Sequence, residues 1–139
     1  MIKHYQIRNL YPLAGTIMSV ALFVVYWDSG FNKFLSLVVT SLGIIIWWTA
    51  TITLGKAFSL IPKASELIKV GIYSKIRHPI YVGLSLVGIG WALLTQTSLL
   101  ILLAVATIVS SIIRAKLEET KLVKTFCEKY LNYKKETWF

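Results

Sequence analysis

The chain has 139 residues and a formal net charge of +9, yet 56% of its residues are hydrophobic and only 15% are charged. An ordinary soluble domain is roughly 45–50% apolar and about 25% charged. This composition excludes a disordered chain, which has few apolar residues, and it disfavours a soluble nucleic-acid binder. A basic chain this apolar is expected to keep its positive charge on one side of a bilayer. The length predicts one domain over residues 1–139.

Four apolar segments without charged residues predict four transmembrane helices, because a membrane helix needs about 20 mostly apolar residues. The first segment covers residues 10–27 and the second covers residues 34–54. The third, residues 80–94, and the fourth, residues 98–113, are shorter and are joined by a tight polar turn. They predict a helical hairpin whose ends thin the bilayer or continue past it. The expected fold class is therefore all-α, an integral-membrane helical bundle.

A cleaved signal peptide is the alternative for the first segment, because Lys3 and Arg8 precede its apolar run. The run is longer than most signal-peptide cores, and no small-residue cleavage site follows it. A membrane helix is therefore the preferred interpretation.

The distribution of Lys and Arg predicts the orientation. With four spans and both termini on the same side, 14 of the 15 basic residues lie on that side. Basic residues concentrate in cytoplasmic loops. We therefore expect both termini, and the polar segments 55–79 and 114–139, to be cytoplasmic.

The first cytoplasmic segment ends on Arg77 and His78, immediately before Pro79. Proline suits the first turn of a helix, so the third helix is predicted to start there. A helix N-terminus offers free N–H groups and a positive dipole to an anionic group. The plainer interpretation is an interfacial anchor of Arg, His and Tyr side chains at headgroup level.

The second cytoplasmic segment carries two adjacent acids, Glu118 and Glu119, in a strongly basic context. Arg114 lies four residues before Glu118, so an intrahelical ion pair is the plain interpretation of that spacing. Apolar and aromatic residues follow at helical spacing and predict a C-terminal amphipathic helix; they are Leu122, Phe126, Tyr130 and Tyr133. Acids near lipid headgroups indicate a cationic or hydroxyl-bearing partner.

These two segments together match the chemistry of S-adenosylmethionine, which carries a carboxylate, an amine, a sulfonium and ribose hydroxyls. Arg77 and the helix start suit the carboxylate, and the glutamates suit the amine or the hydroxyls. Aromatic rings such as those of Tyr73 and Tyr81 suit the sulfonium through cation–π contact.

The same residues resemble the isoprenylcysteine carboxyl methyltransferase family, which is related to the phospholipid N-methyltransferases. The motifs that carry the resemblance are Leu54-Gly55-x-x-Phe58-Ser59, Gly71-x-Tyr73, Arg77-His78-Pro79-x-Tyr81-x-Gly83, Arg114-x-x-x-Glu118-Glu119 and Phe126-x-x-x-Tyr130-x-x-Tyr133. They span residues 54 to about 135, which is over half of the chain.

The resemblance implies an integral-membrane methyltransferase that uses S-adenosylmethionine and acts on a lipophilic acceptor, with carboxyl O-methylation of an isoprenylcysteine-like substrate expected first. Carried over by position, Arg114 orients the substrate. The implied cofactor-binding residues are Arg77, His78, Pro79, Tyr81, Gly83, Glu118 and Glu119. Neither a metal nor a nucleic-acid partner is expected.

Two further features are weaker. Gly88 and Gly90 match a Gly-x-Gly cofactor motif of the related enzymes, although such a pair in a membrane helix is more often a packing feature. Cys127 stands where the resembling family often has glycine, and we interpret this as a position on a helix surface.

Three other functions remain open from the sequence. One is N-methylation of a phospholipid or another small molecule, and a second is a non-catalytic membrane partner protein that retains the fold. The third is an oxidoreductase related to sterol reductases, against which the intact glutamate pair argues. The acceptor, the methylated atom (O, N or S) and the oligomeric state are also left open.

Overall fold

A computed structural model describes residues 2–26, 32–54 and 69–139, with the backbone alone for residues 2–9. The described residues are helical apart from short connections and one isolated backbone bridge. The α-helices are α1 (Ile2–Val25), α2 (Asn32–Leu54), α3 (Pro79–Thr95), α4 (Ser98–Phe126) and α5 (Glu128–Glu136), and a 3₁₀ turn, η2 (Gly71–Ser74), precedes α3. The expected all-α class is confirmed for these residues.

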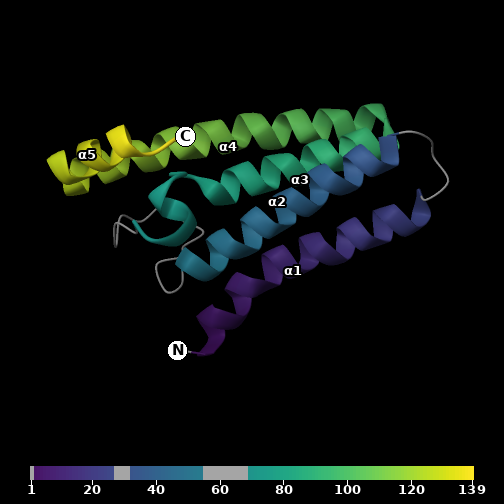
Figure 1. The fold of residues 1–139 in the computed structure, drawn as a ribbon, viewed down its shortest axis with the longest axis horizontal. Coiled ribbons are helices and arrows are strands. Elements are labelled where there is room, and N and C mark those ends of the chain that lie inside the picture. Colours follow the sequence, from purple (N-terminus) through teal and green to yellow (C-terminus); the bar gives the residue numbers. More distant parts are fainter. Residues whose placement is uncertain (1, 27–31, 55–68) are drawn as a thin grey trace.

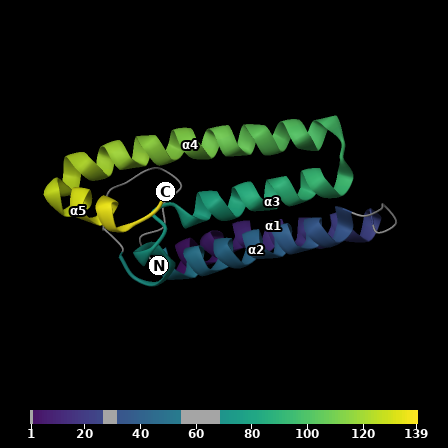
Figure 2. The same cartoon turned by 45° about the horizontal axis from the view of Figure 1, so that its top comes forward.

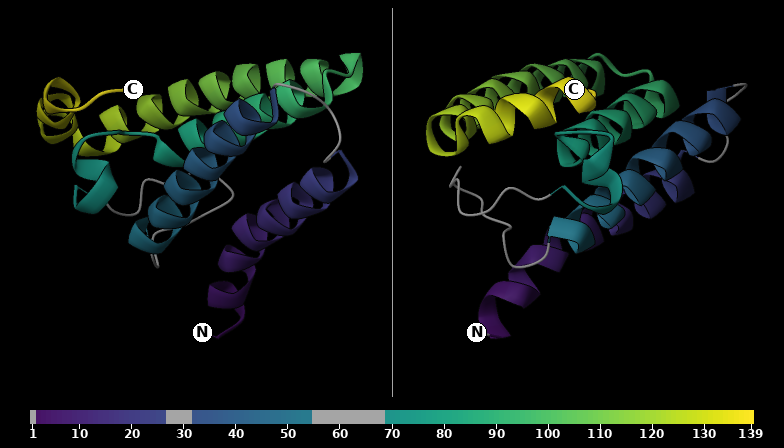
Figure 3. Two further views of the ribbon diagram at one scale, coloured as in Figure 1. Left: turned by 45° about the vertical axis from the view of Figure 1, so that its right-hand side comes forward. Right: turned by 60° about the vertical axis from the view of Figure 1, so that its left-hand side comes forward.

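The long helices lie side by side, with α3 between α2 and α4 and with α1 outside α2 (Figures 1 and 2). Helices α3 and α4 form the predicted hairpin. The short α5 turns back at the far end of α4, so that the C-terminus lies near the start of α3 (Figures 2 and 3). Residues 70–79 and the C-terminal residues therefore meet at one end of the bundle.

Helices α2 and α3 pack with their backbones in close approach, because glycines face each other across the contact. A Cβ on Gly83 would lie 2.8 Å from the carbonyl oxygen of Gly43, and the reciprocal distance is also 2.8 Å. About two helical turns further along α3, a Cβ on Gly90 would lie 2.0 Å from Thr40 Oγ1. Small residues of this kind are typical of helix contacts in membranes, where close van der Waals packing drives association.

Helix α1 is attached to the bundle through two tryptophans. The indole Nε1 of Trp48 in α2 donates to Thr16 Oγ1 at 3.2 Å, and that of Trp91 in α3 donates to Ser19 Oγ at 3.1 Å. Such bonds hold helices together where no water competes for the polar groups.

The lengths of the helices bear on the predicted spans. Helices α2 and α4 are long and apolar enough to cross a membrane, whereas the apolar stretches Leu10–Val25 and Pro79–Thr95 are shorter. The outer faces of α2 and α4 expose large apolar side chains such as Phe34 and Leu102, as a bilayer requires. The four-span arrangement and its orientation stay predictions.

The continuous C-terminal stripe predicted from the sequence is wrong in one respect, because the helix breaks at Cys127. Helix α4 ends at Phe126, and Cys127 has φ 46° and ψ −125°. That left-handed φ is one that glycine adopts without strain. Leu122 and Phe126 therefore belong to α4, while Tyr130 and Tyr133 belong to the returning α5. The position is a chain reversal, not the simple helix surface expected for it.

Candidate active site

The candidate site is built around the first residues of α3. Pro79 is buried in the first turn of that helix and His78 is its N-cap, as the sequence predicted for a proline at a helix start. The preceding turn, η2, is held by the Tyr133 hydroxyl, which donates to the carbonyl oxygen of Tyr73 at 2.5 Å. Helix α5 is thereby fixed against the segment that carries Arg77 and His78.

The C-terminal residues occupy the backbone donors at this helix start. The N–H of Arg77 donates to the backbone oxygens of Trp138 at 2.9 Å and Phe139 at 2.8 Å, and the N–H of His78 donates to that of Phe139 at 3.1 Å. The Trp138 N–H in turn donates to the Lys75 carbonyl at 2.7 Å. The N–H groups of Arg77 and His78 at this helix start are therefore engaged by the chain itself.

Arg77 and Glu119 form the central ion pair of the site. Arg77 Nε donates to Glu119 Oε1 at 3.0 Å, and the other carboxylate oxygen of Glu119 lies 2.7 Å from Lys134 Nζ. Arg77 also donates through its terminal nitrogen to the carbonyl oxygens of Lys134 at 3.1 Å and Thr137 at 2.8 Å. One arginine thus joins the start of α3, the C-terminal part of α4 and the end of α5.

Glu118 contacts the other side of His78. Its Oε1 accepts a hydrogen bond from the Tyr81 hydroxyl, and its Oε2 lies 3.7 Å from His78 Nδ1. The second imidazole nitrogen, Nε2, lies 3.6 Å from Glu119 Oε1. The histidine ring is therefore placed between the two adjacent glutamates, and the Tyr81 ring stacks on it with centroids 5.9 Å apart.

Burial and neighbouring charges set the protonation of these groups. Burial lowers the pKa of His78 below its usual 6.5 in spite of the nearby Glu119, so His78 is neutral at pH 7. Burial raises the pKa of Glu118, against the effects of Tyr81 and Arg114. Burial pushes the Glu119 pKa in the same direction, but the hydrogen bond from Lys134 and the charge of Arg77 outweigh it and lower that pKa overall.

Two buried polar atoms at the site have no hydrogen-bond partner within the described part of the chain. They are His78 Nε2 and the hydroxyl of Tyr130, whose side chain is fully buried. Buried polar groups are normally hydrogen-bonded, so each such exception requires an explanation. A ligand with hydroxyl, amine or carboxylate groups would supply partners for these two atoms, and their donors and acceptors fit S-adenosylmethionine.

Arg114 lies at the exposed margin of this cluster. It is close enough to lower the pKa of Glu118, yet no ion pair within 4.0 Å joins the two among the described residues. The intrahelical pair that the spacing suggested is therefore not formed, because the Glu118 carboxylate turns toward Tyr81. Arg114 itself is exposed.

The glycines of the sequence motifs lie away from this cluster. Gly83 packs against Gly43 and the Trp47 backbone of α2, and Gly90 packs against Thr40. A Cβ on Gly88 would make only ordinary contact with Ala104, at 3.5 Å. The packing interpretation accounts for Gly83 and Gly90, and a cofactor contact by Gly83 stays a prediction.

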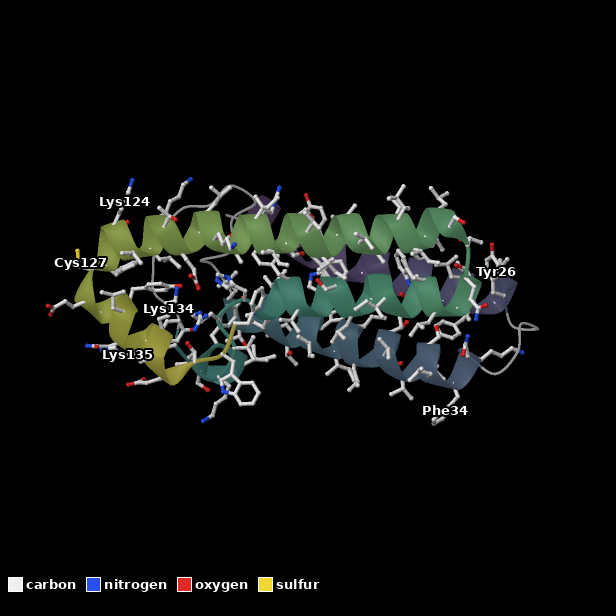
Figure 4. The ribbon with its side chains drawn as sticks, turned by 90° about the horizontal axis from the view of Figure 1, so that it is seen from above. Tyr26, Phe34, Lys124, Cys127, Lys134 and Lys135 are labelled. Carbon is white, nitrogen blue, oxygen red and sulfur yellow. The ribbon has the colours of Figure 1, made fainter. Side chains whose placement is uncertain are left out.

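Sequence reasoning missed Lys134 and did not assign Tyr130 to the site. The sequence analysis counted Lys134 only among the basic residues that predict the orientation. Figure 4 shows its side chain turned toward α4, while that of Lys135 points outward. Tyr130 carried a signal, because it follows the glutamate pair at a motif position. Gly55, Phe58 and Ser59, from the upstream motif, lie outside the described residues, as does most of the predicted segment 55–79.

Comparison with known proteins matches residues 31–129 to the model of the phospholipid methyltransferase family. The chain belongs to this family. The match contains the histidine motif at the start of α3 and both glutamates, so the resemblance inferred from those motifs is confirmed. Curated protein sequences gave no significant match.

One solved structure with the same fold is a eukaryotic intramembrane Ras methyltransferase, isoprenylcysteine carboxyl methyltransferase, determined without a monobody. The TM-score is 0.65 at 23% sequence identity, and the alignment covers 97% of this chain and 50% of that one. The chain thus spans about half the length of that enzyme and shares its fold.

Proposed function

We propose that the protein transfers a methyl group from S-adenosylmethionine to a lipophilic acceptor at the cytoplasmic face of a membrane. The observation that carries this proposal is the convergence of His78, Tyr81 and the two glutamates at one site. Two buried polar atoms there, His78 Nε2 and the Tyr130 hydroxyl, have no hydrogen-bond partner among the described residues. Membership of a methyltransferase family supports the same chemistry. We propose that both termini are cytoplasmic. Most of the basic residues lie on the same side as this cluster, and basic residues concentrate on the cytoplasmic side of a membrane.

The residues of the site supply binding, alignment and exclusion of water. S-adenosylmethionine, when bound, supplies a methyl group activated by the positive charge of its sulfonium. His78 Nε2 and the Tyr130 hydroxyl would pair with its polar groups, and Glu118 would face its positive charge. Holding reactants in line and away from water accounts for up to ~7–11 kcal/mol of a barrier in favourable cases.

Arg114 would orient the acceptor. Its exposed guanidinium lies beside Glu118 at the margin of the cluster, and arginine binds carboxylates in a bidentate manner. We propose carboxyl O-methylation of an isoprenylcysteine-like substrate, because a carboxylate acceptor is already ionised at neutral pH and needs no general base.

N-methylation of a phospholipid headgroup is the second candidate, which the family match favours. Arg114 would then hold the phosphate. An amine acceptor must lose a proton before it attacks, and the neutral His78 or one of the two glutamates would accept it.

Calorimetric titration with S-adenosylhomocysteine tests cofactor use in detergent-solubilised, folded protein. We expect saturable binding, and we expect His78→Ala to raise the dissociation constant at least about 10-fold, because a buried hydrogen bond is lost. His4→Ala, at the chain's other histidine, is the matched control. Folded wild-type protein that does not bind, or binding that His78→Ala leaves unchanged, would contradict the proposal.

Radiolabelled S-adenosylmethionine separates the two acceptors. After incubation with membranes and lipid extraction, treatment with alkali releases the label as methanol from a methyl ester, whereas an N-methyl group keeps it. We expect alkali-labile label in the organic phase that Arg114→Met abolishes. Alkali-stable label would establish the amine acceptor, and label confined to water-soluble products would contradict a lipophilic acceptor.

A further inference from the structure

The two adjacent glutamates have different kinds of partners. Both carboxylate oxygens of Glu119 contact cations, with Arg77 Nε at 3.0 Å and Lys134 Nζ at 2.7 Å. Glu118 instead accepts from the neutral hydroxyl of Tyr81 and lies 3.7 Å from His78 Nδ1. Both carboxylate oxygens of Glu119 therefore contact cations, whereas Glu118 contacts a neutral hydroxyl and the neutral His78, with Arg114 and Lys121 contributing to its electrostatics.

The cations on Glu119 tie down the C-terminal part of the chain. Lys134 lies in the last turn of α5, and Arg77 binds the carbonyl oxygens of Lys134 and Thr137 at the end of that helix. Cations bind well there, because the last carbonyls of a helix lack intrahelical partners. Glu119 is the carboxylate that both cations share.

The ion pairs of Glu119 hold residues 128–139, which form part of the candidate site. Helix α5 carries Tyr130, whose buried hydroxyl has no hydrogen-bond partner in the part of the chain that the structure describes. The segment after α5 places the Phe139 ring against His78, with centroids 5.9 Å apart. The positions of both rings therefore depend on how firmly residues 128–139 are held against α3 and α4.

We propose that Lys134 is a positioning residue that acts through Glu119 to hold α5 and residues 137–139 over His78, and that Glu118 is the carboxylate of the pair that contacts the ligand. The role of Glu118 rests on the proposed function, which supplies its ligand. The role of Lys134 in holding α5 and residues 137–139 over His78, here called the closure, rests on geometry alone. The pKa directions agree with it, because the cations keep Glu119 ionised in their ion pairs while burial raises the pKa of Glu118.

Hydrogen exchange tests the closure without any ligand. We expect Lys134→Met and Glu119→Gln each to speed amide exchange in residues 128–139 several-fold, because local opening becomes easier when a tie is lost. Glu118→Gln keeps the Tyr81 hydrogen bond and leaves exchange there unchanged. Lys135→Met is the matched control, since Lys135 is an exposed neighbour whose side chain points outward (Figure 4). Unchanged exchange in Lys134→Met would overturn the closure.

A double-mutant cycle with S-adenosylhomocysteine tests the division between the glutamates. We expect Lys134→Met to raise the dissociation constant about 3- to 10-fold in the wild type and in Glu118→Gln, but less than about 2-fold in Glu119→Gln, because residues in one network are not additive. Lys134→Arg should restore binding, which a general loss of stability would not explain. Glu118→Gln should raise the dissociation constant about 10-fold or more.

Equal effects of Lys134→Met in all three backgrounds would overturn the link through Glu119. Unchanged binding by Glu118→Gln would overturn its contact with the ligand. Failure of the wild type to bind contradicts the proposed function and with it the assignment of Glu118, while the exchange result still decides the closure.

Discussion

His78 is enclosed by two carboxyl groups and two aromatic rings. Glu118 and Glu119 lie on either side of its imidazole, and the rings of Tyr81 and Phe139 cover it. Burial disfavours the charged imidazolium more strongly than the nearby carboxylates favour it, so the pKa of His78 is lowered. A neutral imidazole offers one donor and one acceptor to a ligand.

The lowered pKa makes stability depend on pH in a defined direction. Below about pH 6.5 the unfolded chain protonates this histidine while the folded protein resists, so the unfolded state binds more protons and stability falls as pH decreases. We expect thermal midpoints in detergent to fall between pH 7.5 and 5.5, and to fall less steeply in His78→Gln. For one proton the slope is at most about 1.4 kcal/mol per pH unit. Equal slopes in both proteins would contradict a buried neutral His78.

The pairing of α2 with α3 fixes where His78 and Tyr81 stand, because both residues lie at the start of α3. Gly83 is two residues beyond Tyr81 and touches the backbone of α2. A side chain there would force the two helices apart, since the obstructing atoms are backbone atoms that cannot rotate away. Gly83 belongs to the histidine motif, but its contacts in the structure are those of helix packing.

Gly83→Ala tests this packing. We expect a loss of ~1–3 kcal/mol of stability from overpacking, seen as a thermal midpoint lower by several degrees. Gly88→Ala is the matched control in the same helix, because its Cβ would meet Ala104 at an ordinary 3.5 Å. If both variants melt like the wild type, the close approach of α2 and α3 is not what Gly83 provides.

The whole molecule is divided between an apolar part and a polar end. Large side chains on the outer faces of the helices are exposed, with Phe34 at 77% and Leu102 at 65%, and in water each such side chain would forgo roughly 25 cal/mol per Å² of burial. The described ion pairs lie where the start of α3 meets α4 and α5. A bilayer around the apolar part leaves the candidate site at its surface.

The predicted orientation is testable through Cys127, the chain's single cysteine, which is exposed at the junction of α4 and α5. We expect a membrane-impermeant maleimide to label it in right-side-out vesicles only after permeabilisation. In Cys127→Ser combined with Ser98→Cys, the new thiol at the exposed start of α4 should react in sealed vesicles. Direct labelling of Cys127 in sealed vesicles would contradict a cytoplasmic C-terminus.

The sequence by itself determined three of the apolar helices and the family. Apolar runs without charges predicted α2, α3 and the apolar part of α4 to within about two residues, because a chain in lipid must satisfy its backbone within each helix. Pro79 marked the start of α3, since its missing N–H is harmless there. The spacing of the histidine motif and the glutamate pair indicated the family, because those residue types must meet to form one site.

The tertiary structure decided which partners the residues of the site contact. Periodicity extended the C-terminal stripe through Cys127, but the chain reverses there and brings Lys134 to Glu119. The packing of the helices also turns Glu118 away from Arg114 and toward Tyr81, and it places Gly83 against α2. None of these contacts is encoded in local spacing. Each arises between two different helices, where the direction of a side chain depends on how the whole bundle packs.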